Sequence, residues 1–205
     1  MGISAAALRA SLEELARREP AIADALNHSG FPEPRISERG YITLLRTIVG
    51  QQVSIKAAAS MWAKLQAAVG DRVEPADVLA ASDETLRGAG LSRQKMSYAR
   101  SLAEEVLSGG LDLHNLPEDD EEAIAQLVRV KGIGRWSAEI YLLFAEGRDD
   151  IWPAGDLAVQ VALGRILGLP EKPSEKMTRE LAEPWRPHRS ALAILSWHHY
   201  KTPVI

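Results

Sequence analysis

Helical periodicity is the feature that most limits how this 205-residue chain can fold. Apolar residues recur at three- and four-residue steps from Ile55 to Val69 and again from Met96 to Val106, which places them on one face of an α-helix. Turn signals containing glycine and proline separate the helical stretches, and no alternating stretch bounded by hairpin-turn residues appears. The sequence therefore predicts an all-α protein of about eight to ten helices with short connections.

Composition excludes several kinds of site. The chain has no cysteine, so it cannot form disulfides, thiolate zinc sites or cysteine-ligated iron–sulfur clusters. Residues 1–20 lack the basic-then-apolar pattern of a signal peptide, and no run approaches the roughly 20 apolar residues that span a bilayer. We therefore expect a cytoplasmic protein without membrane contact.

The formal net charge of −4 is unusual for a protein that binds nucleic acid, because phosphate contacts normally leave a basic footprint. The acids are concentrated in the run Glu118–Glu122, where carboxylates would favour the positive end of a helix that begins there. Arg129, Lys131 and Arg135 lie close together just beyond this run. The placement of the charges is therefore compatible with one basic face on an otherwise acidic protein.

The segment from Leu127 to Ala138 is the most informative part of the sequence. Its Gly132-Ile133-Gly134 triplet suits a tight link between two helices, because glycine permits positive φ and lets another backbone come close. Ile133 would anchor the turn in the core. Gly134 would open the second helix, whose unpaired amides suit a phosphate oxygen. A plain helix–helix connection without a ligand is the alternative on these residues alone.

Asp156 follows about twenty residues later, after a proline and a glycine and before an apolar helical stretch. This context is typical of a helix N-cap. Hydrogen bonds from helix amides stabilise an ionised carboxylate, and such an anion can stabilise positive charge that develops on a sugar or can position a water. Capping and catalysis are therefore compatible. Four other aspartates are rivals by residue type only and lack this context: Asp119, Asp120, Asp149 and Asp150.

In their order and spacing, the segments between about residue 40 and residue 200 resemble the helix-hairpin-helix (HhH-GPD) superfamily of DNA glycosylases. The resemblance is to the DNA-3-methyladenine glycosylase II branch, in a compact form without the N-terminal β-domain of some members. It implies that Asp156 is catalytic and that the hairpin holds a DNA phosphate through Gly132, Ile133, Gly134 and Arg135. It also implies a structural Na⁺ or K⁺ on the backbone carbonyls of Val128, Val130 and Ile133, with no cofactor for catalysis and no iron–sulfur cluster. Val130-Lys131 departs from the Leu-Pro or Phe-Pro that is common in the family.

The residue two positions after the second hairpin glycine decides the expected chemistry. Bifunctional members of the family carry a lysine there, which attacks the sugar and allows strand cleavage. This chain has Trp136, and an indole cannot act as that nucleophile. The resemblance therefore implies a monofunctional glycosylase that leaves an abasic site.

Further positions extend the resemblance, each with a structural alternative. Gln52 matches the residue that fills the gap left by a flipped base, with Gln51 beside it, although two glutamines also suit a polar helix junction. Ser92 lies in a segment that resembles the family's second phosphate-facing turn, and the alternative is that it caps the next helix. The base pocket is expected to comprise Trp136, Ile140, Trp185 and His188. An electron-rich indole attracts a positively charged methylated base, whereas the alternative places both tryptophans in the core.

We expect two helical lobes, residues 41–148 ending in the hairpin and residues 1–40 with 149–205 carrying Asp156, with a flipped nucleotide in the cleft between them. The expected partner is damaged double-stranded DNA and the expected state is a monomer, cytoplasmic and nucleoid-associated if bacterial. A non-catalytic module that binds DNA structure through the same hairpin is the main alternative. A helical protein–protein adaptor suits the acidic charge but leaves the hairpin unexplained.

Overall fold

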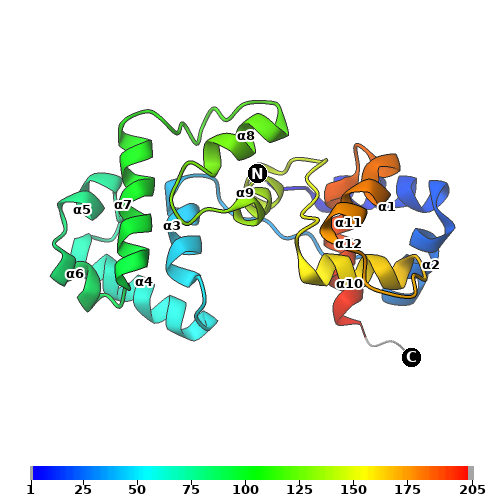
Figure 1. Ribbon diagram of the computed structural model, residues 1–205, viewed down its shortest axis with the longest axis horizontal. Helices are drawn as coiled ribbons and strands as arrows, with labels where there is room; N and C mark the ends of the chain where they lie inside the picture. The colour runs from blue at the N-terminus through cyan, green and yellow to red at the C-terminus, as the bar shows by residue number, and fades with distance from the viewer. Residues whose placement is uncertain (1, 203–205) are drawn as a thin grey trace. The chain divides into compact units, whose positions relative to one another are not determined.

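The computed structural model describes residues 2–202, which form twelve α-helices, one π-helix and one 3₁₀ helix (Figure 1). No strand occurs between these residues, so the predicted all-α class is confirmed. The sequence underestimated the number of helices because α5 (Pro75–Ala80) and α6 (Asp83–Gly88) have six residues each. A helix of fewer than two turns shows too few apolar positions for a periodicity to be recognised.

The chain divides into two compact units, residues 38–138 and residues 1–37 with 139–205. The sequence had assigned residues 139–148 to the hairpin lobe, whereas their contacts group them with the terminal segments. This segment contains a π-helix, Leu142–Glu146, of which Leu142, Leu143, Phe144 and Ala145 are buried. The amide of Ser37 donates to the carbonyl of Phe144 (2.9 Å), which ties this segment to the N-terminal part of its unit.

The unit of residues 38–138 is built around α7 (Arg93–Leu107), which packs against α3 (Tyr41–Gly50) and α5. In turn α3 packs on α4 (Ile55–Val69), and α4 on α6. The unit continues through α8 (Asp120–Leu127) to the hairpin and the start of α9 (Arg135–Tyr141). Its fully buried core includes Leu44, Leu45, Ile48, Leu65, Leu86, Leu102 and Leu127.

The other unit joins both ends of the chain around α12 (Arg189–Lys201). Its partners are α1 (Ala5–Arg18), α2 (Pro20–Ser29) and α10 (Leu157–Ile166), and α11 (Glu175–Ala182) packs on α10. A 3₁₀ helix, Glu183–Trp185, precedes α12. The core of this unit includes Leu8, Leu12, Leu15, Ile22, Leu143, Leu163, Leu192 and Leu195.

Side-chain caps explain why many of the helices begin where they do. Asp119 accepts from the amide of Glu122 (2.9 Å), which confirms that the acidic run marks a helix start. Ser54 and Ser92 cap α4 and α7 in the same way. Each cap satisfies one of the amides that a helix N-terminus leaves without a partner. Ile55, the first residue of the predicted apolar face of α4, is nevertheless 92% exposed.

No helix within the described part of the chain is long and apolar enough to cross a membrane.

Candidate functional site

The hairpin joins α8 to α9 through a tight turn. Val128 ends α8 as its C-cap, and the amide of Ile133 donates to the carbonyl of Val130 across the turn (3.0 Å). Gly132 has φ 85°, whereas Gly134 is not among the glycines with positive φ. Ile133 is 3% exposed, so its expected role as the anchor of the turn is confirmed. The two glycines thus have different roles: Gly132 provides the positive φ of the turn, and Gly134 directly precedes α9.

Tyr98, on α7, packs directly against the hairpin. A Cβ on Gly132 would overlap the tyrosine ring, reaching within 2.5 Å of Cε2 and closer to Cδ2 and Cγ. A Cβ on Gly134 would meet no heavy atom within 4 Å. Close approach of a ring to the backbone therefore requires glycine at position 132, and the surroundings of Gly134 are open.

Charged side chains surround the hairpin. The Arg135 guanidinium binds both carboxylate oxygens of Glu121 (2.8 and 2.5 Å). Arg129 pairs with Glu105 (3.0 Å), and Lys131 is exposed while its amide donates to Ser101 Oγ (3.0 Å). The local acids thus pair with two of the three basic residues that the sequence placed here. Lys131 carries its charge on the exposed side of the turn.

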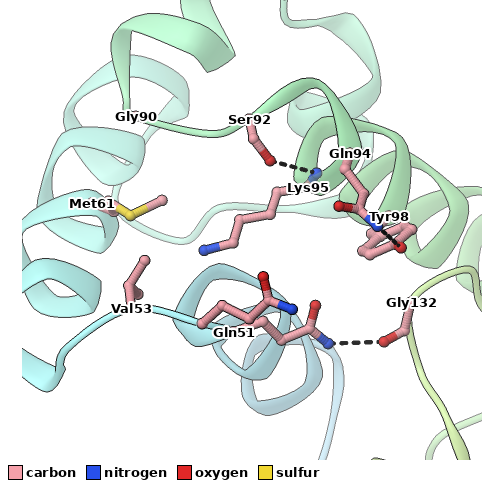
Figure 2. A pocket seen from close by; sticks show the side chains of 10 residues that line it. Gln51, Val53, Met61, Gly90, Ser92, Gln94, Lys95, Tyr98 and Gly132 are labelled. Atoms are coloured by element: carbon pink, nitrogen blue, oxygen red, sulfur yellow. Dashed lines mark hydrogen bonds between the residues drawn. The ribbon is translucent and has the colours of Figure 1, made fainter.

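A pocket of about 330 Å³ lies beside the hairpin, between the turn that follows α3 and the start of α7 (Figure 2). It brings together four residues predicted to contact DNA: Gln51, Gln52, Ser92 and Gly132. Gln51 donates from Nε2 to the carbonyl of Gly132 (2.8 Å), and Gln52 is exposed with φ 54°. Ser92 accepts from the amide of Lys95 (3.2 Å) as the N-cap of α7. The capping role that the sequence offered as the alternative for Ser92 is therefore present.

Lys95 and Tyr98 line the same pocket but were not predicted as site residues. Lys95 Nζ donates to the carbonyl of Val49 (2.7 Å), and burial lowers the pKa of this amine. The hydroxyl of Tyr98 accepts a hydrogen bond from Gln94. The only sequence signal was that both side chains follow Ser92 on the first two turns of one helix. Val49, which binds Lys95, and Gly132, against which Tyr98 packs, both lie far away in the chain.

Asp156 is the N-cap of α10, as its context predicted. Its Oδ1 accepts from the amide of Val159 (3.0 Å), and its own amide donates to the carbonyl of Pro153 (2.9 Å). A carboxylate offers about four lone pairs, so a capping aspartate can accept other hydrogen bonds as well. The carboxylate is partly exposed at the positive end of the helix dipole, which favours negative charge there.

The loop that carries Asp156 is held at several points. Trp152 Nε1 donates to the carbonyl of Thr178 (2.9 Å), and the buried Gln160 donates from Nε2 to the carbonyl of Ala154 (2.7 Å). Lys172 in turn donates to Gln160 Oε1 (2.7 Å). A loop fixed by hydrogen bonds on both sides keeps a carboxylate in one place, as a preorganised site requires.

The rival aspartates have structural positions. Asp119 caps α8, and Asp150 binds Arg189 through both carboxylate oxygens (2.8 Å each) and Arg186 (2.9 Å). Asp149 is exposed, and its carbonyl accepts from Ser190. Asp120 lies in the first turn of α8, where a carboxylate stabilises the helix.

The predicted base-pocket residues differ in exposure. Trp136 is 47% exposed near the start of α9, whereas Trp185 is 5% exposed and belongs to the core. Ile140 is half-buried, and so is His188, whose Nδ1 lies 3.1 Å from Ser11 Oγ. Of the two indoles, Trp136 therefore offers surface to a ligand.

The described residues contain no group of three or more His, Asp or Glu side chains able to hold a metal ion.

Comparison with known proteins places this geometry in a family. Residues 45–187, more than half of the chain, match the model of the HhH-GPD superfamily of base excision DNA repair proteins. DNA-3-methyladenine glycosylase 1 of Schizosaccharomyces pombe is 31% identical over 166 residues, covering 79% of this chain and 72% of that protein.

Solved structures agree with this match. The crystal structure of a DNA-3-methyladenine glycosidase from Bacillus halodurans superposes with a TM-score of 0.86 at 28% identity, covering 94% of this chain and 89% of that one. A Schizosaccharomyces pombe 3-methyladenine DNA glycosylase in complex with abasic DNA gives 0.75 at 26% identity, covering 91% and 94%. The hairpin and the capped Asp156 lie within the matched residues. This chain therefore belongs to the HhH-GPD superfamily of base excision DNA repair proteins.

Proposed function

We propose that this protein is a monofunctional DNA glycosylase that hydrolyses the N-glycosidic bond of alkylated bases, mainly methylated purines, flipped out of double-stranded DNA. The proposal is supported by relatives that are named as 3-methyladenine glycosylases. The observation that carries it is the Asp156 carboxylate, held at the N-terminus of α10 in a braced loop downstream of the hairpin. The hairpin would bind the DNA, and Asp156 would supply the catalytic carboxylate.

The reaction needs a stabiliser of positive charge more than an acid. An alkylated purine already carries positive charge, so its bond to the sugar is weak and the base can leave without being protonated. As it departs, the sugar becomes oxocarbenium-like, and the Asp156 anion stabilises that charge. The same carboxylate can position or deprotonate the water that completes hydrolysis.

Recognition of the base would rest on Trp136, with Ile140, Trp185 and His188 completing the pocket. The exposed indole of Trp136 can stack on a cationic base, and such contacts contribute about 0.5–2 kcal/mol each. Because Trp136 occupies the position of the lysine of bifunctional members, the product is an abasic site in an uncut strand. Borohydride trapping of a covalent enzyme–DNA adduct would contradict this part of the proposal. Lys131 would then be the first candidate for the nucleophile.

Phosphate would be bound at the hairpin by Gly132, Ile133, Gly134 and Arg135, with Gln51, Gln52 and Ser92 on the adjoining surface. The carbonyls of Val128, Val130 and Ile133 would hold a Na⁺ or K⁺ that adds positive charge behind the phosphate. These carbonyls suit such an ion, because Val128 is the C-cap of α8, where carbonyls carry partial negative charge, and Val130 follows two residues later in the turn. The Val130 carbonyl retains one lone pair beyond its bond to Ile133.

Catalysis itself needs no cofactor in this proposal. The expected location, cytoplasmic and nucleoid-associated if the protein is bacterial, belongs to the same proposal, as does the monomer.

Asp156→Asn tests the mechanism because asparagine caps a helix as well as aspartate does. The variant removes the charge and keeps the cap, so we expect duplex binding to persist and single-turnover release of methylated base to fall by at least about 100-fold. Asp149→Asn, which neutralises an exposed aspartate of the same unit, is the matched control and should keep the wild-type rate. Near-normal base release by Asp156→Asn would refute the mechanism.

A further inference from the structure

The turn after α3 presents Gln52 in an unusual backbone conformation. Gln52 has φ 54° and is exposed, although residues with a Cβ seldom occupy the left-handed region. Such a conformation persists where the surroundings hold it in place. Two side-chain hydrogen bonds lie close to Gln52 in the sequence: one is donated by the side chain of Gln51, and the other is accepted by the carbonyl of Val49.

The first bond ties the turn to the hairpin. Gln51 is half-buried, and its Nε2 donates to the carbonyl of Gly132 (2.8 Å), 81 residues away (Figure 2). The ring of Tyr98 packs against Gly132 from α7, so this glycine has little freedom to move. The amide group of Gln51 is thereby committed to a contact within the protein.

The second bond ties the end of α3 to α7. The last carbonyls of a helix lack intrahelical partners and favour a nearby cation, and Lys95 Nζ donates to one of them, that of Val49 (2.7 Å). In Figure 2 the Lys95 side chain extends from its helix into the pocket toward the turn. Burial lowers the pKa of this amine, as expected for an ammonium turned toward the protein.

We propose that Gln51 and Lys95 are positioning residues, which hold the turn so that Gln52 is ready to enter the DNA stack while the hairpin grips the phosphate. This inference rests on the proposed function, because it assigns to two residues the positioning of Gln52, the residue predicted to fill the gap left by the flipped base. It also gives the two adjacent glutamines different roles. Gln52 fills the gap left by the flipped base, and Gln51 ties the turn that carries Gln52 to the hairpin. Lys95, although basic and beside the DNA-facing turn, is not a phosphate contact.

A double-mutant cycle tests whether Gln51 acts through Gln52. The probe is a duplex with 2-aminopurine next to a tetrahydrofuran abasic site, whose fluorescence reports filling of the gap. Gln51→Met, which keeps the size and loses the donor, should weaken gap filling about 5- to 10-fold in the wild-type background. In the Gln52→Ala background it should change gap filling less than about 2-fold. An undiminished effect in that background would overturn the positioning role.

The salt dependence of duplex binding tests Lys95. Each phosphate contact contributes about 0.9 to the slope of log K against log salt concentration. Lys95→Met should keep the wild-type slope while gap filling weakens, and Lys95→Arg should restore much of the gap filling. Lys131→Met should lower the slope, whereas Lys64→Met, at an exposed position on α4, should leave both measurements unchanged. A slope reduced by about 0.9 in Lys95→Met would make Lys95 a phosphate contact and overturn the proposal.

Neither measurement depends on base release. A wild-type protein that fills the gap but releases no methylated base would refute the proposed function and leave the positioning test valid. Urea unfolding of each variant provides the folding control. If Gln51→Met fails to fold, Gln51→Glu, which also lacks the donor, replaces it. Its effect on gap filling is then measured in the wild-type and Gln52→Ala backgrounds, with the same expected results.

Discussion

The two hairpin glycines offer a matched pair of substitutions, Gly132→Ala and Gly134→Ala, with opposite expected outcomes. At Gly132 an alanine must adopt φ 85°, which costs about 1 kcal/mol for a residue with a Cβ. The same Cβ overlaps the ring of Tyr98, and relief of such overpacking costs about 1–3 kcal/mol. We therefore expect Gly132→Ala to lower the free energy of unfolding by about 2–4 kcal/mol.

At Gly134 neither cost applies, because φ is not positive and a Cβ meets nothing within 4 Å. The loss of stability should stay below about 1 kcal/mol, which reflects only the poorer capping by alanine. The methyl group would instead stand where the proposed phosphate approaches the amides of α9. Binding of an abasic duplex should therefore weaken by about 10-fold or more, which corresponds to about 1.4 kcal/mol.

Urea denaturation gives the stabilities, and fluorescence anisotropy at fixed salt gives the affinities. Wild-type stability in Gly132→Ala would refute the inference that Tyr98 and the positive φ require glycine. Wild-type affinity in a folded Gly134→Ala would refute the assignment of the phosphate to this end of α9.

Three further predictions concern the core and pH. Trp185→Ala should destabilise the fold by about 3–5 kcal/mol because the Trp185 side chain is buried. Trp136→Ala should cost about 1 kcal/mol or less of stability and should mainly slow base release. Thermal unfolding measures the first effect, and single-turnover rates measure the second. Arg189→Met should lower the free energy of unfolding by about 3 kcal/mol, because it removes a bidentate ion pair from the largely buried carboxylate of Asp150. A change below about 1 kcal/mol in urea unfolding would contradict this prediction. Burial lowers the pKa of His199 below 6.5, so the unfolded chain binds the proton first and stability should fall as pH drops below 6.5. His199→Gln should flatten this dependence in melting curves between about pH 7 and 5, and an unchanged dependence would exclude His199 as its source.

Local chemistry explains why much of the helical framework was predictable. The caps Ser92, Asp119 and Asp156 each act on an amide three residues ahead, so the signal and its partner stand side by side in the sequence. The hairpin was recognisable for the same reason, since its glycines and the buried Ile133 are neighbours. Periodicity predicted α4 and α7 but not the six-residue α5 and α6, which are too short to repeat a pattern.

Contacts between distant residues decided the rest. By sequence, two tryptophans near helix starts are equivalent candidates for a base pocket, and only packing buries Trp185 while it leaves Trp136 exposed. Two adjacent glutamines likewise look alike until Gln51 is seen to bind Gly132, 81 residues away. The sequence by itself therefore determined the longer helices, the caps Ser92, Asp119 and Asp156, and the hairpin, because these depend on interactions within one or two helical turns. Which side chain faces solvent and which holds a distant backbone was decided by the tertiary structure alone, because burial and long-range hydrogen bonds exist only after the helices have packed.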